Sequence, residues 1–183
     1  MDLVAAELPA VVIAARAGDR RAFAELYRRF SRAVHGVILA RAPYRDTPDL
    51  VQDVFALALA KLPQLAEAEA FPGWILAIAR NRATDHLRVK RLAIEDVDDV
   101  ASETSGVRAS LEAQRVLTAL RALPDAYRET LILRLVEGLT GPEIAAQTGL
   151  APGSVRVNLH RGMKLLREKL GITDEEVSDE RVG

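Results

Sequence analysis

The sequence contains no cysteine and few aromatic residues. Without cysteine, the chain cannot form disulfides, thiolate metal sites or a cysteine nucleophile. Aromatic residues make up 4% of the chain, so a core must rest mainly on Ala, Leu, Val and Ile. The three histidines, His35, His86 and His160, lie far apart and none has a second ligand at a metal-binding spacing. No nucleophile–base set, glycine-rich phosphate loop or carboxylate pair is present, so we expect no metal, no cofactor and no enzyme.

A long apolar run is also missing. The short run at residues 8–15 follows Asp2 and Glu7, where a signal peptide would carry positive charge, and Arg16 interrupts it. It is too short to span a bilayer and is typical of an amphipathic helix. We therefore expect a cytoplasmic protein without membrane insertion, which the absence of cysteine also favours.

No segment has the alternating pattern of a strand, and nearly every apolar stretch has helical spacing. The sequence predicts an all-α fold with two small helical domains joined by a flexible linker. We expect a first bundle at residues 1–92, an acidic linker at 93–109, a second domain at 110–171 and an acidic, disordered tail at 172–183.

Charge is segregated along the chain, although the formal net charge is only -1. The end of the first domain is basic, the linker is acidic, the last helix is basic and the tail is acidic again. This alternation favours two basic working surfaces between acidic connectors. The alternative is that these helices are charged only because they are exposed.

Residues 140–162 have the pattern of a helix-turn-helix. Thr140 is placed to cap a short helix that has Pro142 in its first turn. Gly149 stands where the turn between crossed helices requires a positive φ. Pro152 and Ser154 then open the last helix.

The last helix has one apolar stripe, from Val155 to Leu170, and an opposite polar face. In a helix-turn-helix, this second helix enters the major groove of DNA, where arginine reads guanine, asparagine reads adenine and an apolar side chain meets a thymine methyl group. The candidate residues on or beside this face are Gly153, Ser154, Arg156, Val157, Asn158, His160, Arg161 and Lys164. The alternative is a plain helical hairpin with a basic exterior.

Three segments carry a family resemblance. "LPDAYRETLILRLVEGLTGPEIAAQTGLAPGSVRVNLHRGMKLLREKL" resembles region 4 of bacterial sigma factors, especially the extracytoplasmic-function (ECF) subfamily of the sigma-70 family. "DLVQDVFALALAKL" is similar to their region 2.2, and "FPGWILAIARNRATDHLR" to regions 2.3 and 2.4. The resemblance covers residues 18–170. The linker between the two matching regions is too short to hold the extra helical domain of housekeeping sigma factors.

The resemblance implies a sigma factor that binds core RNA polymerase and directs promoter-specific transcription initiation. Region 4 would read the −35 element as duplex, and region 2 would open the −10 element and capture a flipped base. The family's −10 segment falls on Arg80, Asn81, Arg82, Asp85, Arg88, Lys90 and Arg91. The family's specificity loop falls on residues 66–70, whose acidic and small side chains leave the accepted base open. Trp74 is a candidate for base stacking, but its apolar surroundings favour a core position.

The resemblance also implies partners. Asp49, Gln52 and Asp53 stand where the family binds the β′ clamp helices of core polymerase. The apolar helix at residues 127–136 stands where region 4 docks on the β flap. Promoter DNA and an anti-sigma factor complete the expected partners.

Two other functions stay open at this stage. A stand-alone helix-turn-helix regulator would need a dimer interface and a palindromic site, and the sequence has no spare apolar helix for one. A sigma-like decoy that binds an anti-sigma factor without DNA would have lost the basic residues that this chain retains.

Overall fold

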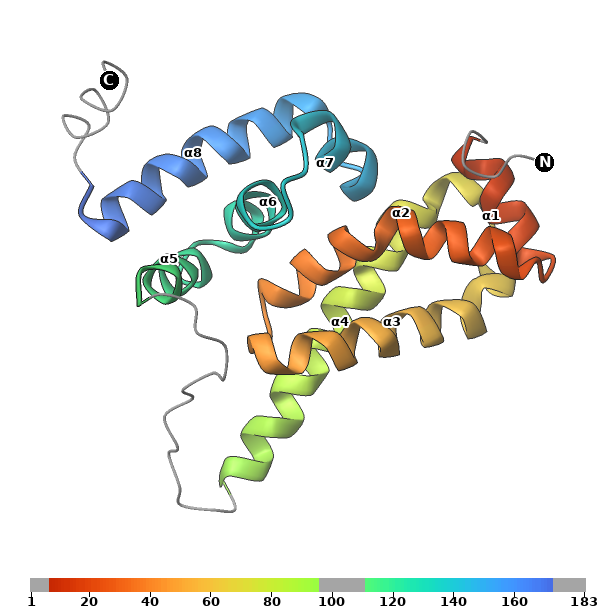
Figure 1. Ribbon diagram of the computed structural model, residues 1–183, viewed down its shortest axis with the longest axis horizontal. Coiled ribbons are helices and arrows are strands. Elements are labelled where there is room, and N and C mark those ends of the chain that lie inside the picture. The colour runs from red at the N-terminus through yellow and green to blue at the C-terminus, as the bar shows by residue number, and fades with distance from the viewer. Residues whose placement is uncertain (1–6, 96–110, 173–183) are drawn as a thin grey trace.

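The computed structural model describes residues 7–95 and 111–172, and every regular element in this part of the chain is a helix (Figure 1). It contains no strand, which confirms the predicted all-α class. Most of the predicted linker and tail lies outside these residues. The elements are α1 (Leu8–Arg16), α2 (Arg20–Leu39), η1 (Tyr44–Asp46), α3 (Thr47–Lys61), η2 (Leu62–Gln64), η3 (Ala68–Ala70), α4 (Phe71–Glu95), α5 (Leu111–Arg121), α6 (Asp125–Leu135), α7 (Gly141–Thr148) and α8 (Pro152–Leu170).

Local sequence signals set most helix boundaries. The Asp19 carboxylate caps α2 by accepting hydrogen bonds from the backbone of Arg21 and Ala22, at 2.8 and 3.2 Å. Pro48 stands in the first turn of α3, where its missing N–H needs no partner. The segment before α4 was predicted as a loop, but it contains the short helix η3, and α4 begins at Phe71.

Helices α1 to α4 form an N-terminal bundle. Its core follows the apolar stripes of α2, α3 and α4, with Leu26, Val54 and Ile75 buried where these helices meet. The rings of Phe30 and Phe71 meet edge to face with centroids 5.1 Å apart, which is a favoured aromatic geometry.

Helices α5 to α8 form a C-terminal bundle in which α6 packs against α5, α7 and α8. Gly162 of α8 permits close contact with α6, because a Cβ there would lie 3.0 Å from Leu131 Cδ1 and 3.1 Å from Tyr127 Cβ. Leu120, Ile132 and Leu166 belong to the apolar cluster between α5, α6 and α8.

The two bundles pack directly against each other, with α6 against α2 and α7 against both α2 and α4 (Figure 1). Leu133, Leu139 and Ile144 of the C-terminal bundle are buried in the same apolar cluster as the N-terminal core. We call this the closed arrangement. The sequence predicted two domains but gave no indication that they touch.

Candidate nucleic-acid interface

The predicted helix-turn-helix is formed by α7 and α8. Thr140 and Glu143 make a reciprocal capping box at the start of α7, with Glu143 Oε2 accepting from the Thr140 backbone N–H at 2.7 Å. The hydrogen bonds from the backbone and the hydroxyl of Thr140 lower the pKa of Glu143. Gly149 ends α7 with φ +74°, the left-handed conformation that the turn required. The angle between the helices is therefore fixed by local geometry.

The outer face of α8 is open to solvent. Val157 is 42% exposed although it is apolar and has no core to join. Seven of the eight predicted reading residues are exposed, and they are Gly153, Ser154, Arg156, Val157, His160, Arg161 and Lys164. The opposite stripe holds α8 in place through buried Val155 and Leu166.

The eighth reading residue is turned partly inward. The Asn158 side-chain amide lies 3.5 Å from the hydroxyl of Thr130 on α6, and Asn158 is only partly exposed. In this arrangement its amide is directed toward a neighbouring helix. Leu150, which follows Gly149 in the turn, is 39% exposed.

A second exposed polar face lies on the latter half of α4. Asn81 and Arg88 are exposed, and Arg88 pairs with Asp85 at 3.4 Å. Lys90 lies 3.6 Å from Asp46. The backbone of Arg91 continues α4, but its side chain is outside the described part of the structure.

Asp46 anchors this face to the chain before α3. Burial disfavours its ionised form, but a 2.9 Å hydrogen bond from His86 and the charges of Lys90, His86 and Arg45 together lower its pKa. The carboxylate therefore stays charged and offsets part of the positive charge of α4.

The structure joins two predicted sites that are distant in sequence. Arg82 of the predicted −10 set donates a hydrogen bond to Asp53 of the predicted polymerase-binding set. Asp49 and Gln52 are exposed on the same helix as Asp53. The two predicted sets therefore meet at this contact between α3 and α4.

Arg80 has a different environment from the other predicted −10 residues. Its guanidinium donates to both oxygens of Glu129 on α6, at 3.1 Å from Nε and 2.7 Å from Nη2. Arg41 of the segment after α2 donates to the same carboxylate at 2.9 Å. The hydrogen bonds from Arg80 to Glu129 raise the pKa of that arginine.

Sequence reasoning did not identify Glu129. The available signal was an acidic residue next to the apolar run of "ETLILRLV". A buried carboxylate generally has a cationic partner, but the sequence did not say which.

The loop at residues 66–70 is held by α1. Arg16 donates to the carbonyl oxygens of Leu65 and Ala66, at 2.7 and 3.0 Å. Ala68 is buried, and Glu67 and Glu69 are exposed. Trp74 is partly buried and stacks at a tilt on Phe71, with ring centroids 5.8 Å apart, which agrees with a core position.

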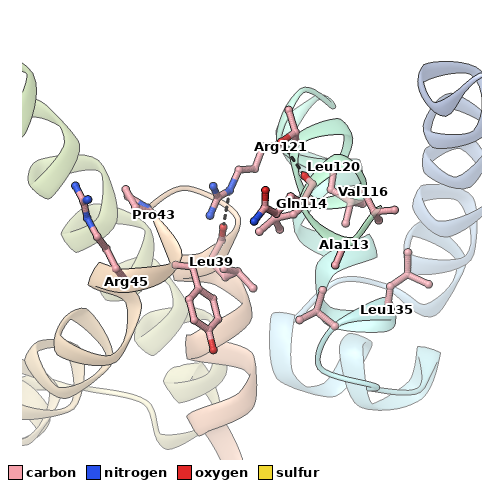
Figure 2. Close-up of a pocket in the computed structure, with 13 residues that line it drawn as sticks. Leu39, Pro43, Arg45, Ala113, Gln114, Val116, Leu120, Arg121 and Leu135 are labelled. Atoms are coloured by element: carbon pink, nitrogen blue, oxygen red, sulfur yellow. Dashed lines mark hydrogen bonds between the residues drawn. The ribbon is translucent and has the colours of Figure 1, made fainter. Parts of the chain in front are cut away.

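An apolar groove of about 590 Å³ lies between the bundles, where α5 and the end of α6 face the end of α2 and the residues around η1. Figure 2 shows Val116, Leu120 and Leu135 on one side and Leu39 on the other. Arg121 crosses the groove and donates to the Leu39 carbonyl oxygen at 3.4 Å.

Within residues 7–95 and 111–172, His, Asp and Glu side chains form no cluster of three that could hold a metal. The same part of the chain has no helix with the length and apolar character needed to cross a bilayer. The site is thus built from cationic and polar side chains on two exposed helix faces.

The fold and these faces define an all-α protein with a helix-turn-helix. A sequence profile described as "Sigma-70 region 2" matches residues 26–92, and one described as "Sigma-70, region 4" matches residues 113–166. The RNA polymerase sigma factor CarQ of Myxococcus xanthus is 33% identical over 170 residues, covering 89% of this chain and 97% of CarQ. The sigma factor CnrH of Cupriavidus metallidurans is 32% identical over 187 residues, covering 90% and 95%. The ECF sigma-E factor of Escherichia coli K12 is 28% identical over 169 residues, covering 84% and 88%.

Solved structures of sigma factors also match this chain. The structure of CnrH in complex with the cytosolic domain of CnrY matches with a TM-score of 0.60 and 27% identity, covering 90% of this chain and 97% of CnrH. The sigma factor RpoE of Bartonella quintana, in complex with the anti-sigma factor NepR, matches with a TM-score of 0.56 and 26% identity, covering 81% and 95%. This chain belongs to the ECF subfamily of the sigma-70 family.

Proposed function

We propose that this chain binds core RNA polymerase and directs it to promoters by reading two DNA elements. The observation that supports this most is the pair of exposed polar and cationic faces, one on α4 and one on α8. Each face lies in a segment that matches a different sigma region. We assign residues 1–92 to polymerase and −10 binding, and 110–171 to −35 binding.

In this proposal α8 reads the −35 element as duplex. Arg156 and Arg161 are exposed and long enough to reach guanine acceptors or phosphates, and Val157 is placed to meet a thymine methyl group. The N-terminal end of α8 enters the groove, because Arg156 and Val157 lie in its first two turns and the apolar stripe is held by α6.

The −10 element is captured on α4 as single strand. Asn81 offers an amide to a base edge, while Arg82 and Arg88 offer charge to the backbone. The loop at 66–70 would receive the flipped base, and its anchoring by Arg16 keeps its backbone in place. Small and acidic loop residues favour a base that is bound by its polar edge.

Partners follow from the remaining surfaces. Asp49, Gln52 and Asp53 would bind the β′ clamp helices, and the exposed Leu135 and Val136 would meet the β flap. The Bartonella RpoE was solved with the anti-sigma factor NepR, and CnrH with the cytosolic domain of CnrY, so we expect an anti-sigma factor here as well. Because the proposed partner, core RNA polymerase, acts in the cytoplasm, we expect this chain to act there too.

Run-off transcription with core polymerase tests the proposal. Arg161→Ala should lower initiation about tenfold on promoters that depend on the −35 element, because one groove contact is worth about 1–3 kcal/mol. Asn81→Ala should leave duplex binding intact and impair strand opening, measured by permanganate reactivity. Glu112→Ala, an exposed change away from both faces, serves as the control.

Two results would contradict the proposed function. If the chain with core polymerase initiates on no genomic fragment, the proposal is wrong. If the chain alone binds a palindromic site as a dimer, the function is that of a stand-alone regulator.

A further inference from the structure

We propose that Glu129 is a latch that keeps the two bundles closed, and that the chain must release this latch before it can contact both promoter elements. The inference rests on the proposed function for its consequence in transcription. The latch itself rests on the contacts between the bundles.

The latch is one carboxylate from the C-terminal bundle that is held by two arginines from the N-terminal bundle. Glu129 is 8% exposed, and it is bound by Arg80 through two hydrogen bonds and by Arg41 through one. Such charge-assisted bonds from a planar guanidinium are among the stronger polar contacts in proteins. The described C-terminal bundle supplies no hydrogen bond to this carboxylate, so its charge serves the contact between the bundles.

Further polar contacts around the latch join the same two bundles. His35 Nδ1 lies 2.6 Å from Glu137 Oε1, and Arg121 and Arg128 donate to the carbonyl oxygens of Ala42 and Ala40 at 2.8 and 3.2 Å. All of these contacts join the end of α2 to the C-terminal bundle. The bonds from Arg121 and Arg128 satisfy backbone carbonyl groups of the turn that follows α2.

Gly36 marks a close contact between the bundles. A Cβ at this position would lie 2.8 Å from Leu133 Cδ2 and 3.0 Å from Glu137 Cγ. Leu133 is fully buried in the closed arrangement and would be uncovered when α6 leaves α2. Burial of this side chain favours closure when no partner covers it.

In the closed arrangement, α4 and α8 lie too close together to contact both promoter elements at once. Helix α7 packs on α4 and α8 packs on α7, so two packing distances place the start of α8 about 20 Å from α4. Elements centred near −35 and −10 are about 25 base pairs apart, or about 85 Å along B-form DNA. One closed chain cannot contact both elements, and the bundles must separate.

Separation is physically accessible because the latch is made of charges. When the pair opens, Glu129 and the arginines regain hydration, which offsets much of the lost attraction. Arg80 then becomes available for a DNA phosphate, which is an equivalent anionic partner. The same guanidinium thus holds the resting state and serves the −10 strand.

The test measures the distance between the bundles in the full-length chain. Because the sequence lacks cysteine, Ala60→Cys on α3 and Glu168→Cys on α8, both exposed, accept a dye pair without background labelling. Glu129→Gln keeps the size of the side chain and removes its charge. Gly36→Leu acts at a different contact between the bundles, against Leu133, and should open it sterically with no change of charge. Glu112→Gln is the control on an exposed part of the C-terminal bundle.

We expect high energy transfer in the free wild type and in Glu112→Gln, and a shift toward low transfer in both Glu129→Gln and Gly36→Leu. Core polymerase should lower transfer in every variant. Because affinity scales with the fraction of binding-competent molecules, the two opened variants should bind core polymerase about tenfold more tightly.

The possible outcomes test the Glu129 latch and the proposed role in transcription separately. Low transfer in the free wild type would overturn the latch. Unchanged high transfer in Glu129→Gln would overturn it as well, whether or not Gly36→Leu opens. If the distances change as expected but no variant binds core polymerase, the latch stands and the proposed function is wrong.

Discussion

At the scale of single residues, charged side chains inside this protein are paired, and their partners come from two ranges of sequence distance. Glu25 is paired within its own helix, by Arg28 and Arg29. Glu129 is paired across the molecule, by Arg80 and Arg41. Helical spacing predicts pairs of the first kind, since residues three and four apart share a face. Pairs of the second kind depend on which helices meet.

The pH dependence of stability should reveal Glu25. Arg28 donates two hydrogen bonds to its carboxylate, and despite opposition from burial these bonds, with those of Arg29, lower its pKa from 4.5 to about 2. The contribution of a lowered pKa is complete above the unfolded value and is lost as pH falls through the folded value. Glu25→Gln should therefore lower the unfolding free energy by about 1 kcal/mol at pH 7.

Urea unfolding from pH 7 to pH 3 measures this effect. The difference between wild type and Glu25→Gln should shrink steadily below about pH 5, while the exposed Glu67→Gln serves as the matched control. A difference that does not change across this range would contradict the assignment.

At the scale of elements, the helix-turn-helix depends on local interactions that can be predicted from the sequence. The cap by Thr140, the left-handed Gly149 and the exposed Val157 all agree with the predicted motif. Each follows from helical periodicity or from the backbone freedom of one residue type. The partial turning of Asn158 toward α6 was not predictable, because it depends on the hydroxyl of Thr130 beneath it.

Two glycine substitutions in this element should change stability in opposite directions. A Cβ at Gly149 would meet no atom within 4 Å, so Gly149→Ala costs only the strain of a positive φ, about 1 kcal/mol. Gly153 lies in the first turn of α8, also with open space, and alanine there should stabilise by up to about 1 kcal/mol.

Thermal unfolding of the full chain, followed by circular dichroism, compares the two variants directly. If Gly149→Ala raised the unfolding temperature as much as Gly153→Ala does, the backbone at position 149 would not be strained by a side chain.

At the scale of the whole molecule, the two bundles of the closed arrangement are joined by a shared apolar core and by ion pairs. Leu133, Leu139 and Ile144 share a buried cluster with the N-terminal core, and Glu129 joins the bundles by charge. The predicted linker at residues 93–109 falls mostly outside the described residues, with α4 continuing to Glu95. The contact between the two bundles was not predicted.

Cooperative unfolding should follow from this shared cluster. The single tryptophan, Trp74, reports on the N-terminal bundle, whereas far-UV circular dichroism reports on both bundles. In the wild type the two urea curves should coincide. In Gly36→Leu they should separate, because the bundles no longer share buried surface.

Two matched observations check this prediction. Gly73→Ala, at an exposed site with open space, should keep the curves together. Separate curves in the wild type would mean that the bundles unfold independently.

The sequence by itself determined the helices, their caps, the turn at Gly149 and the two exposed polar faces, because each of these depends on residues within a few positions of one another. Only the tertiary structure decided that Arg80 binds Glu129, 49 residues away, and that Gly36 receives Leu133. Such contacts depend on how two helix surfaces fit in shape and charge. That fit exists only after the chain has folded.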